Sequence, residues 1–102
     1  MVSAAVRGVR GDLDPQLLGV VDAHDHLFFR SPLLKGQELD DTGLAREELA
    51  AFAAVGGGTV VQWTPYGLGR RAAELPALSA ATGVHVVAAT GLHQSAHYEP
   101  AA

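Results

Sequence analysis

Three short apolar runs alternate with two alanine-rich stretches of helical character, and this alternation most constrains the fold. The runs cover residues 20–27, 59–64 and 84–90, and the second and third contain no Asp, Glu, Lys or Arg. The stretches between them, residues 44–55 and 70–82, have the length of ordinary helices. Strands separated by helices of about a dozen residues pair in parallel through right-handed crossovers. The sequence therefore predicts an α/β fold with a three-stranded parallel sheet.

Turn and cap residues bound these elements. Asp41 and Thr42 are N-cap candidates for the first helix, and three glycines, 56–58, end it. Pro76 either kinks the second helix or marks its true first turn. Residues 4–12 predict a small hairpin or a capping ribbon, because Arg-Gly-Asp signals a turn. Four apolar residues of the first helix recur near helical spacing, which predicts that they form its buried face. They are Leu44, Leu49, Phe52 and Val55.

Composition limits the partners and the kind of metal site. The 102 residues allow one ordinary domain at most. The chain has seven scattered Lys and Arg residues and a net charge of −4, which argues against a nucleic-acid partner. No apolar run approaches the ~20 residues of a membrane span, and no signal peptide is recognisable, so we expect a cytoplasmic protein without a membrane partner. Because the chain has no cysteine, a metal would need His, Asp or Glu ligands.

His24 and His26 end the first apolar run and are the candidate metal ligands. Alternate residues of a strand face the same side, so the two imidazoles are expected to project together. On the same reasoning, Asp22 shares their face, from where it could orient a ligand, and Asp25 points toward the helices. Zinc sites commonly contain two or three histidines. The alternative is an ordinary surface pair, since His-x-His also occurs by chance.

The convergence of strand ends favours the metal interpretation. In parallel sheets, functional residues gather at the carboxyl ends of the strands. The histidine pair ends the first predicted strand, residues 63–64 end the second and residues 90–93 follow the third. We therefore expect one site at this edge of the sheet. His85 starts the third strand at the opposite end and is expected to be structural or solvent-facing, whereas His97 either touches substrate or is solvated.

Several segments together resemble the phosphotriesterase family of the amidohydrolase superfamily. They are Val-Arg-Gly-Val-Arg-Gly at 6–11, Leu-Gly at 18–19, Asp-Ala-His-Asp-His-Leu at 22–27, Gly-Leu-Gly-Arg at 67–70, and the run from Val84 to His93. His-x-His alone would identify only the superfamily. The resemblance implies the N-terminal part, about three βα units, of a (β/α)8 TIM barrel of the metal-dependent hydrolase type. Residues 1–102 would then form a partial barrel domain that ends after its third strand.

The resemblance also implies a metal centre and a reaction. It implies two divalent metals, usually Zn²⁺, with His24 and His26 as ligands and no further catalytic residue in this chain. The remaining ligands of the family have no matching position, and Lys35 lies in a loop. The implied reaction is hydrolysis of a phosphotriester, lactone or carboxylic ester by a metal-activated hydroxide. The expected partner is a small ester or lactone, with a homodimer as the expected assembly. Pocket residues of the family correspond to Phe29, Leu68 and His93.

Two alternatives stay open. A deaminase or a TatD-like nuclease would keep the histidine pair, although the Val-Arg-Gly and Gly-Leu-Gly-Arg segments speak against both. The chain could also be a truncated fragment without catalytic activity alone, because two histidines do not complete a dinuclear site. Three strands would leave open sheet edges, which are an aggregation hazard.

Overall fold

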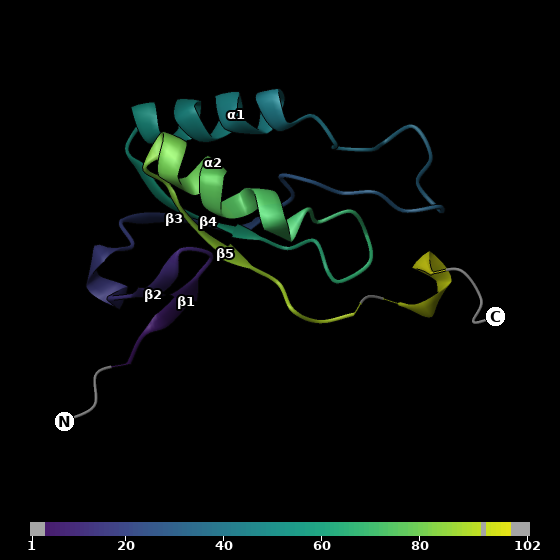
Figure 1. Ribbon diagram of the computed structural model, residues 1–102, viewed down its shortest axis with the longest axis horizontal. Helices are drawn as coiled ribbons and strands as arrows, with labels where there is room; N and C mark the ends of the chain where they lie inside the picture. Colours follow the sequence, from purple (N-terminus) through teal and green to yellow (C-terminus); the bar gives the residue numbers. More distant parts are fainter. Residues whose placement is uncertain (1–3, 93, 99–102) are drawn as a thin grey trace.

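A three-stranded parallel sheet with two helices on one face forms the centre of the computed structural model, which describes residues 4–92 and 94–98. Figure 1 shows the two helices side by side above the sheet, with the termini at opposite ends. The order in the sheet follows the order in the chain. The strands are β3 (Val20–Asp25), β4 (Gly57–Gln62) and β5 (His85–Ala88), and the helices are α1 (Thr42–Ala54) and α2 (Leu75–Thr82). The predicted α/β fold with a parallel sheet is confirmed.

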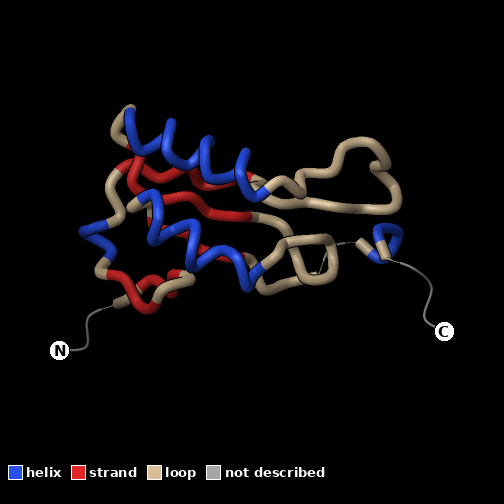
Figure 2. Tube along the Cα trace, turned by 45° about the horizontal axis from the view of Figure 1, so that its top comes forward, coloured by secondary structure: helices blue, strands red, loops and turns tan. Residues whose placement is uncertain are grey.

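A small hairpin lies at the amino ends of the sheet strands. Its strands β1 (Val6–Gly8) and β2 (Gly11–Leu13) pair antiparallel, which agrees with the turn predicted there. The Val9 amide donates to the Val86 carbonyl at 2.8 Å, so the hairpin is attached to β5. Figure 2 shows the hairpin near the N-terminus and the long loops at the opposite end. The loops therefore gather where the sheet strands end.

The core lies between the sheet and the helices. Its buried apolar side chains come from the sheet, both helices and the segment after β3: Leu27, Phe28, Ala45, Leu49, Val60, Leu75, Leu78, Val84 and Val86. Burial of such side chains contributes about 1.5–3 kcal/mol each before entropy is subtracted. Asp41 caps α1, since its carboxylate accepts the Leu44 amide at 3.0 Å. Neither helix of the described part is long and apolar enough to cross a membrane.

The second helix begins at Leu75 and not at residue 70, after a short 3-10 turn, η2 (Ala72–Glu74). Of the two interpretations of Pro76, the one in which it marks the first turn is confirmed. Pro76 lies in the first turn of α2, where its missing amide hydrogen costs nothing. In the first helix, Leu44 and the C-cap residue Val55 are exposed instead of buried, and Ala45 packs in the core. The helix lies on the sheet along a stripe rotated from the predicted one, which spacing alone does not determine.

Parallel pairing of β3 with β4 contains two irregularities. Val20 pairs with Gly57 and Val21 with Thr59, so β4 has one extra residue, Gly58. Gly58 packs against the backbone of Leu18 and Gly19, where a Cβ would overlap the Leu18 carbonyl oxygen. Further along, Asp22 pairs with Val60 and Asp25 with Gln62, so β3 contains the extra residue there. This second bulge reverses which side chains face the helices.

Gly58→Ala is expected to lower the free energy of unfolding by about 1–3 kcal/mol, because the backbone must shift to admit the methyl group. Gly91→Ala is the matched control, since a Cβ at Gly91 meets nothing within 4 Å and its φ is not positive. Urea unfolding followed by circular dichroism measures both. Equal stability of the two variants would contradict this account of β4.

Candidate metal and substrate site

A hollow of about 540 Å³ lies where the three sheet strands end. Side chains from the β3 end, the β4 end and the segment after β5 line it. They include His24, His26, Phe29, Trp63, Leu92 and His97. We call this cavity the site hollow. The convergence of strand ends expected from the sequence is therefore present.

His24 and His26 both border the site hollow, and their ring centroids are 5.5 Å apart with an interplanar angle of 75°. A zinc–nitrogen bond is about 2.0–2.1 Å long, so two imidazoles on one ion have centroids within roughly 6 Å of each other. The measured separation of the two rings lies within this range. Within residues 4–92 and 94–98, no group of three or more His, Cys, Asp or Glu residues is placed to hold a metal. Further ligands would have to come from other residues.

Trp63 holds the ring of His24. The indole and imidazole rings are stacked, with centroids 4.5 Å apart and an interplanar angle of 4°. The indole is itself held, because its Nε1–H donates to the Ala23 carbonyl at 2.6 Å. The sequence places Trp63 at a strand end, but the stack depends on the relative position of two strands. Its aromatic surface, 48% exposed, forms one wall of the site hollow.

Asp22 and Asp25 lie on the opposite face from the histidines. Both border a small depression against α1, beside Glu48 and Phe52. The prediction for Asp25 is confirmed, whereas the prediction that Asp22 shares the histidine face is wrong. The bulge between the two aspartates adds one residue to β3, so strict alternation fails there. A hydrogen bond with Asp25, together with burial, raises the pKa of Asp22.

A buried polar cluster supports His26 from the sheet side. Its Nδ1 lies 3.0 Å from Thr64 Oγ1. Thr64 and Gln62 are both fully buried, although each is polar. The side chain of Gln62 accepts the Leu27 amide at 2.9 Å and donates to the Phe28 carbonyl at 3.3 Å. Sequence reasoning missed this role of Gln62 and Thr64, although two polar residues in an otherwise apolar strand were an available signal.

The predicted substrate-binding residues have different surroundings. Phe29 borders the site hollow, with its ring centroid 5.5 Å from that of His26. Leu68 is 1% exposed and is not among the residues lining the hollow; its carbonyl accepts the Arg30 amide at 2.6 Å. His93 lies outside the described residues. Of the two that the structure describes, Phe29 lies beside the histidines.

His85 and His97 lie at opposite ends of the sheet. His97 borders the site hollow, and its Nδ1 lies 2.7 Å from Ser31 Oγ. His85 is the first residue of β5, at the opposite end of the strand from the hollow, as expected. The two phenylalanines after β3 are also separated. Phe28 is fully buried in the core, and Phe29 lines the hollow.

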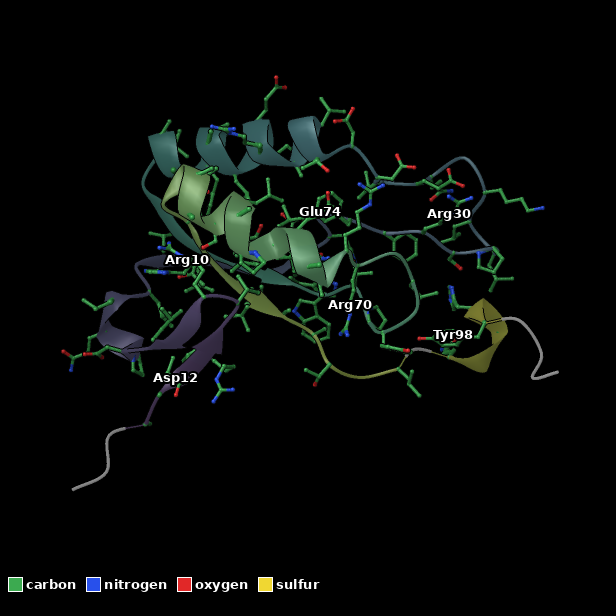
Figure 3. All side chains as sticks on the ribbon, viewed as in Figure 1. Arg10, Asp12, Arg30, Arg70, Glu74 and Tyr98 are labelled. Atoms are coloured by element: carbon green, nitrogen blue, oxygen red, sulfur yellow. The ribbon has the colours of Figure 1, made fainter. Side chains whose placement is uncertain are left out.

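Arginine and tyrosine side chains connect the loops around the hollow. Figure 3 shows Arg30, Arg70 and Tyr98 at the loop end of the molecule, away from Arg10 and Asp12 on the hairpin side. Arg70 Nη1 donates to the Ala89 carbonyl at 2.7 Å, which ties the loop after β4 to the end of β5. The Tyr98 hydroxyl donates to the Tyr66 carbonyl at 2.7 Å. These bonds hold the rim of the site together.

Comparison with known proteins is decisive about the family. The profile of the Phosphotriesterase family matches residues 4–102. The chain belongs to the phosphotriesterase family. The resemblance seen in its sequence is therefore confirmed. A curated relative in this comparison is the N-acetyltaurine hydrolase of Danio rerio, which is 35% identical over 89 residues, covering 81% of this chain and 25% of the relative.

Solved structures show the same family fold. A lactonase from Listeria monocytogenes matches with a TM-score of 0.76 and 28% identity, over 83% of this chain and 27% of the lactonase. An organophosphorus hydrolase from Deinococcus radiodurans matches with a TM-score of 0.73 and 33% identity, over 85% of this chain and 28% of that protein. Two of these three proteins are named as hydrolases and the third as a lactonase. This phosphotriesterase-family chain spans about a quarter of the length of each.

Gln62→Leu is expected to lower the free energy of unfolding by about 1–3 kcal/mol, because the Leu27 amide and the Phe28 carbonyl lose their buried partner. Gln37→Leu is the matched control, since Gln37 is exposed in a loop. Urea unfolding measures both free energies. A Gln62→Leu variant as stable as the control would show that the polar cluster contributes nothing to folding.

Proposed function

We propose that this chain supplies His24 and His26 as metal ligands to a hydrolase that cleaves lactones, carboxylic esters or phosphotriesters. The observation that carries the proposal is the placement of both imidazoles in one hollow at the carboxyl ends of parallel strands. The family adds support, because its named relatives include a lactonase and an organophosphorus hydrolase. Two histidines 5.5 Å apart by ring centroid suit a divalent ion such as Zn²⁺.

Bound divalent metals supply a hydroxide at neutral pH and polarise a carbonyl or phosphoryl oxygen. The residues of this chain have separate roles around that chemistry. His24 and His26 hold an ion through ring nitrogens. Trp63 fixes the plane of His24, and Phe29 offers an apolar wall for the substrate. The resulting pocket is mainly apolar with a few polar groups, as small-molecule sites usually are.

We further propose that residues 1–102 are a partial domain, the N-terminal part of a (β/α)8 barrel. The face of the sheet opposite the helices supports this, since it leaves apolar side chains in solvent. Val21 is 41% exposed and Trp63 is 48% exposed. A complete barrel of this kind needs about 250 residues. The relatives agree with this, because each is roughly four times as long as the region that matches this chain. The remaining metal ligands would come from the other strands.

Zinc is expected to change the fluorescence of Trp63 in a saturable way. Trp63 is the only tryptophan of the chain and stacks on His24, so an ion bound to that ring alters its surroundings. Titration of the metal-free chain with zinc sulfate measures the effect. Binding of at most one ion per chain is expected, because two histidines cannot hold a pair of metals.

His24→Ala and His26→Ala are each expected to abolish the response to zinc. His85→Ala is the matched control, because His85 lies at the other end of β5 and should leave the response unchanged. If zinc does not change the fluorescence of Trp63 in the unsubstituted chain, the metal site is refuted. Tight binding of two ions would instead contradict the partial-domain proposal.

In the protein with its complete barrel, either histidine substitution is expected to remove hydrolysis of a γ-lactone by more than 100-fold. The reason is that a bound metal provides the nucleophile. Assays of a γ-lactone, an aryl ester and N-acetyltaurine under the same conditions separate the substrate classes. Preference for N-acetyltaurine would overturn the ester assignment while keeping the metal site. Full activity of His26→Ala would overturn the role of His26 as a metal ligand.

A further inference from the structure

His26 contacts a chain of hydrogen bonds that ends on backbone groups able only to donate or only to accept, and this allows the proton on its Nδ1 to be placed. Gln62 is the last residue of β4 and Thr64 follows two residues later; their side chains are in contact, and both are fully buried. His26 follows the end of the neighbouring strand β3, with its Nδ1 3.0 Å from Thr64 Oγ1. The protons of this cluster can be assigned one after another.

The orientation of Gln62 comes first. The Leu27 amide can only donate, so the atom that it meets at 2.9 Å is the carbonyl oxygen Oε1. The Phe28 carbonyl can only accept, so the atom at 3.3 Å from it is Nε2. Both backbone groups thus require the same orientation of the amide. Gln62 Oε1 is therefore an acceptor toward its other neighbours.

The hydroxyl of Thr64 comes second. Its single proton is near two oxygens that only accept, Gln62 Oε1 at 3.1 Å and the carbonyl oxygen of Phe28. If the hydroxyl donated its proton to His26, the lone pairs of Thr64 Oγ1 would point at both acceptor oxygens and be repelled by them. Donation to either of these oxygens removes one of the two repulsions. Thr64 then has a lone pair toward His26 Nδ1, which must donate the bond between them.

We propose that Thr64, oriented by Gln62, is a positioning residue that holds His26 in the tautomer protonated at Nδ1. The lone pair of the neutral ring is then on Nε2, which makes Nε2 the atom that binds a metal. His24 is oriented differently, by its stack on Trp63. The value of this device for catalysis rests on the proposed metal site, whereas the tautomer itself is a property of the metal-free protein.

Imidazole nitrogen NMR of the metal-free chain tests the tautomer directly, at a pH where His26 is neutral. The expected spectrum has a pyrrole-type shift at His26 Nδ1 and a pyridine-type shift at Nε2. A pyridine-type shift at Nδ1 in the unsubstituted chain would overturn the proposal without the use of any variant. Zinc is absent from this experiment, so its outcome does not depend on the proposed function.

Thr64→Val removes the hydroxyl with little change in shape and is expected to give a mixture of the two tautomers at His26. Thr64→Ser keeps the hydroxyl and should retain the Nδ1–H form. Thr90→Val is the matched control, because Thr90 is exposed at the end of another strand and should leave the His26 spectrum unchanged. An unaltered Nδ1–H form in folded Thr64→Val would overturn the role of Thr64.

Zinc affinity, measured by the fluorescence of Trp63 in competition with a chelator, gives the second readout. Loss of a hydrogen-bond partner behind a metal-binding histidine typically weakens metal binding roughly 10- to 100-fold. Thr64→Val is expected to show a loss in that range, and Thr64→Ser should restore most of the affinity. An unsubstituted chain that has the Nδ1–H tautomer but does not respond to zinc would refute the metal site and leave the action of Thr64 on His26 standing.

Discussion

The parallel pairing of β3 with β4, with its two bulges, is the constraint on which the rest of the structure depends. Because Gly58 has no side chain, β4 can approach the backbone of Leu18 and Gly19, the residues that precede β3. The Thr59 hydroxyl donates to the Leu18 carbonyl there at 2.7 Å. The extra residue between Asp22 and Asp25 then turns both aspartates toward α1. The same shift leaves His24 and His26 on the opposite face. Without it, strict alternation would place Asp22 beside the histidines.

A second dependence links the core to the site. Gln62 and Thr64 are buried polar groups, which cost free energy unless their hydrogen bonds are made. Their partners are the backbone of Leu27 and Phe28 and the ring of His26. The groups that fix the path of the chain after β3 are thus the same groups that hold one of the candidate ligands. The same contacts therefore set both the path of this segment and the orientation of His26.

Several parts of the site could be predicted because they follow from local pattern. Histidines two apart near a strand end share a side, and strand ends of a parallel sheet converge, so His24, His26 and Trp63 were expected near one another. Leu68 shows the limit of such reasoning. It lies in a loop near the site, but it is buried and its carbonyl accepts the Arg30 amide. Loop residues have no periodicity from which the direction of a side chain could be predicted.

By itself, the sequence determined the order of strands and helices, the parallel sheet, the family and the edge at which a site would form. Each of these depends on periodicity, caps and motifs that are local in the chain. Only the tertiary structure decided the face of Asp22, the stack of Trp63 on His24 and the cluster behind His26. The physical reason is that each depends on the register between two strands, which is set by contacts between residues nearly forty positions apart.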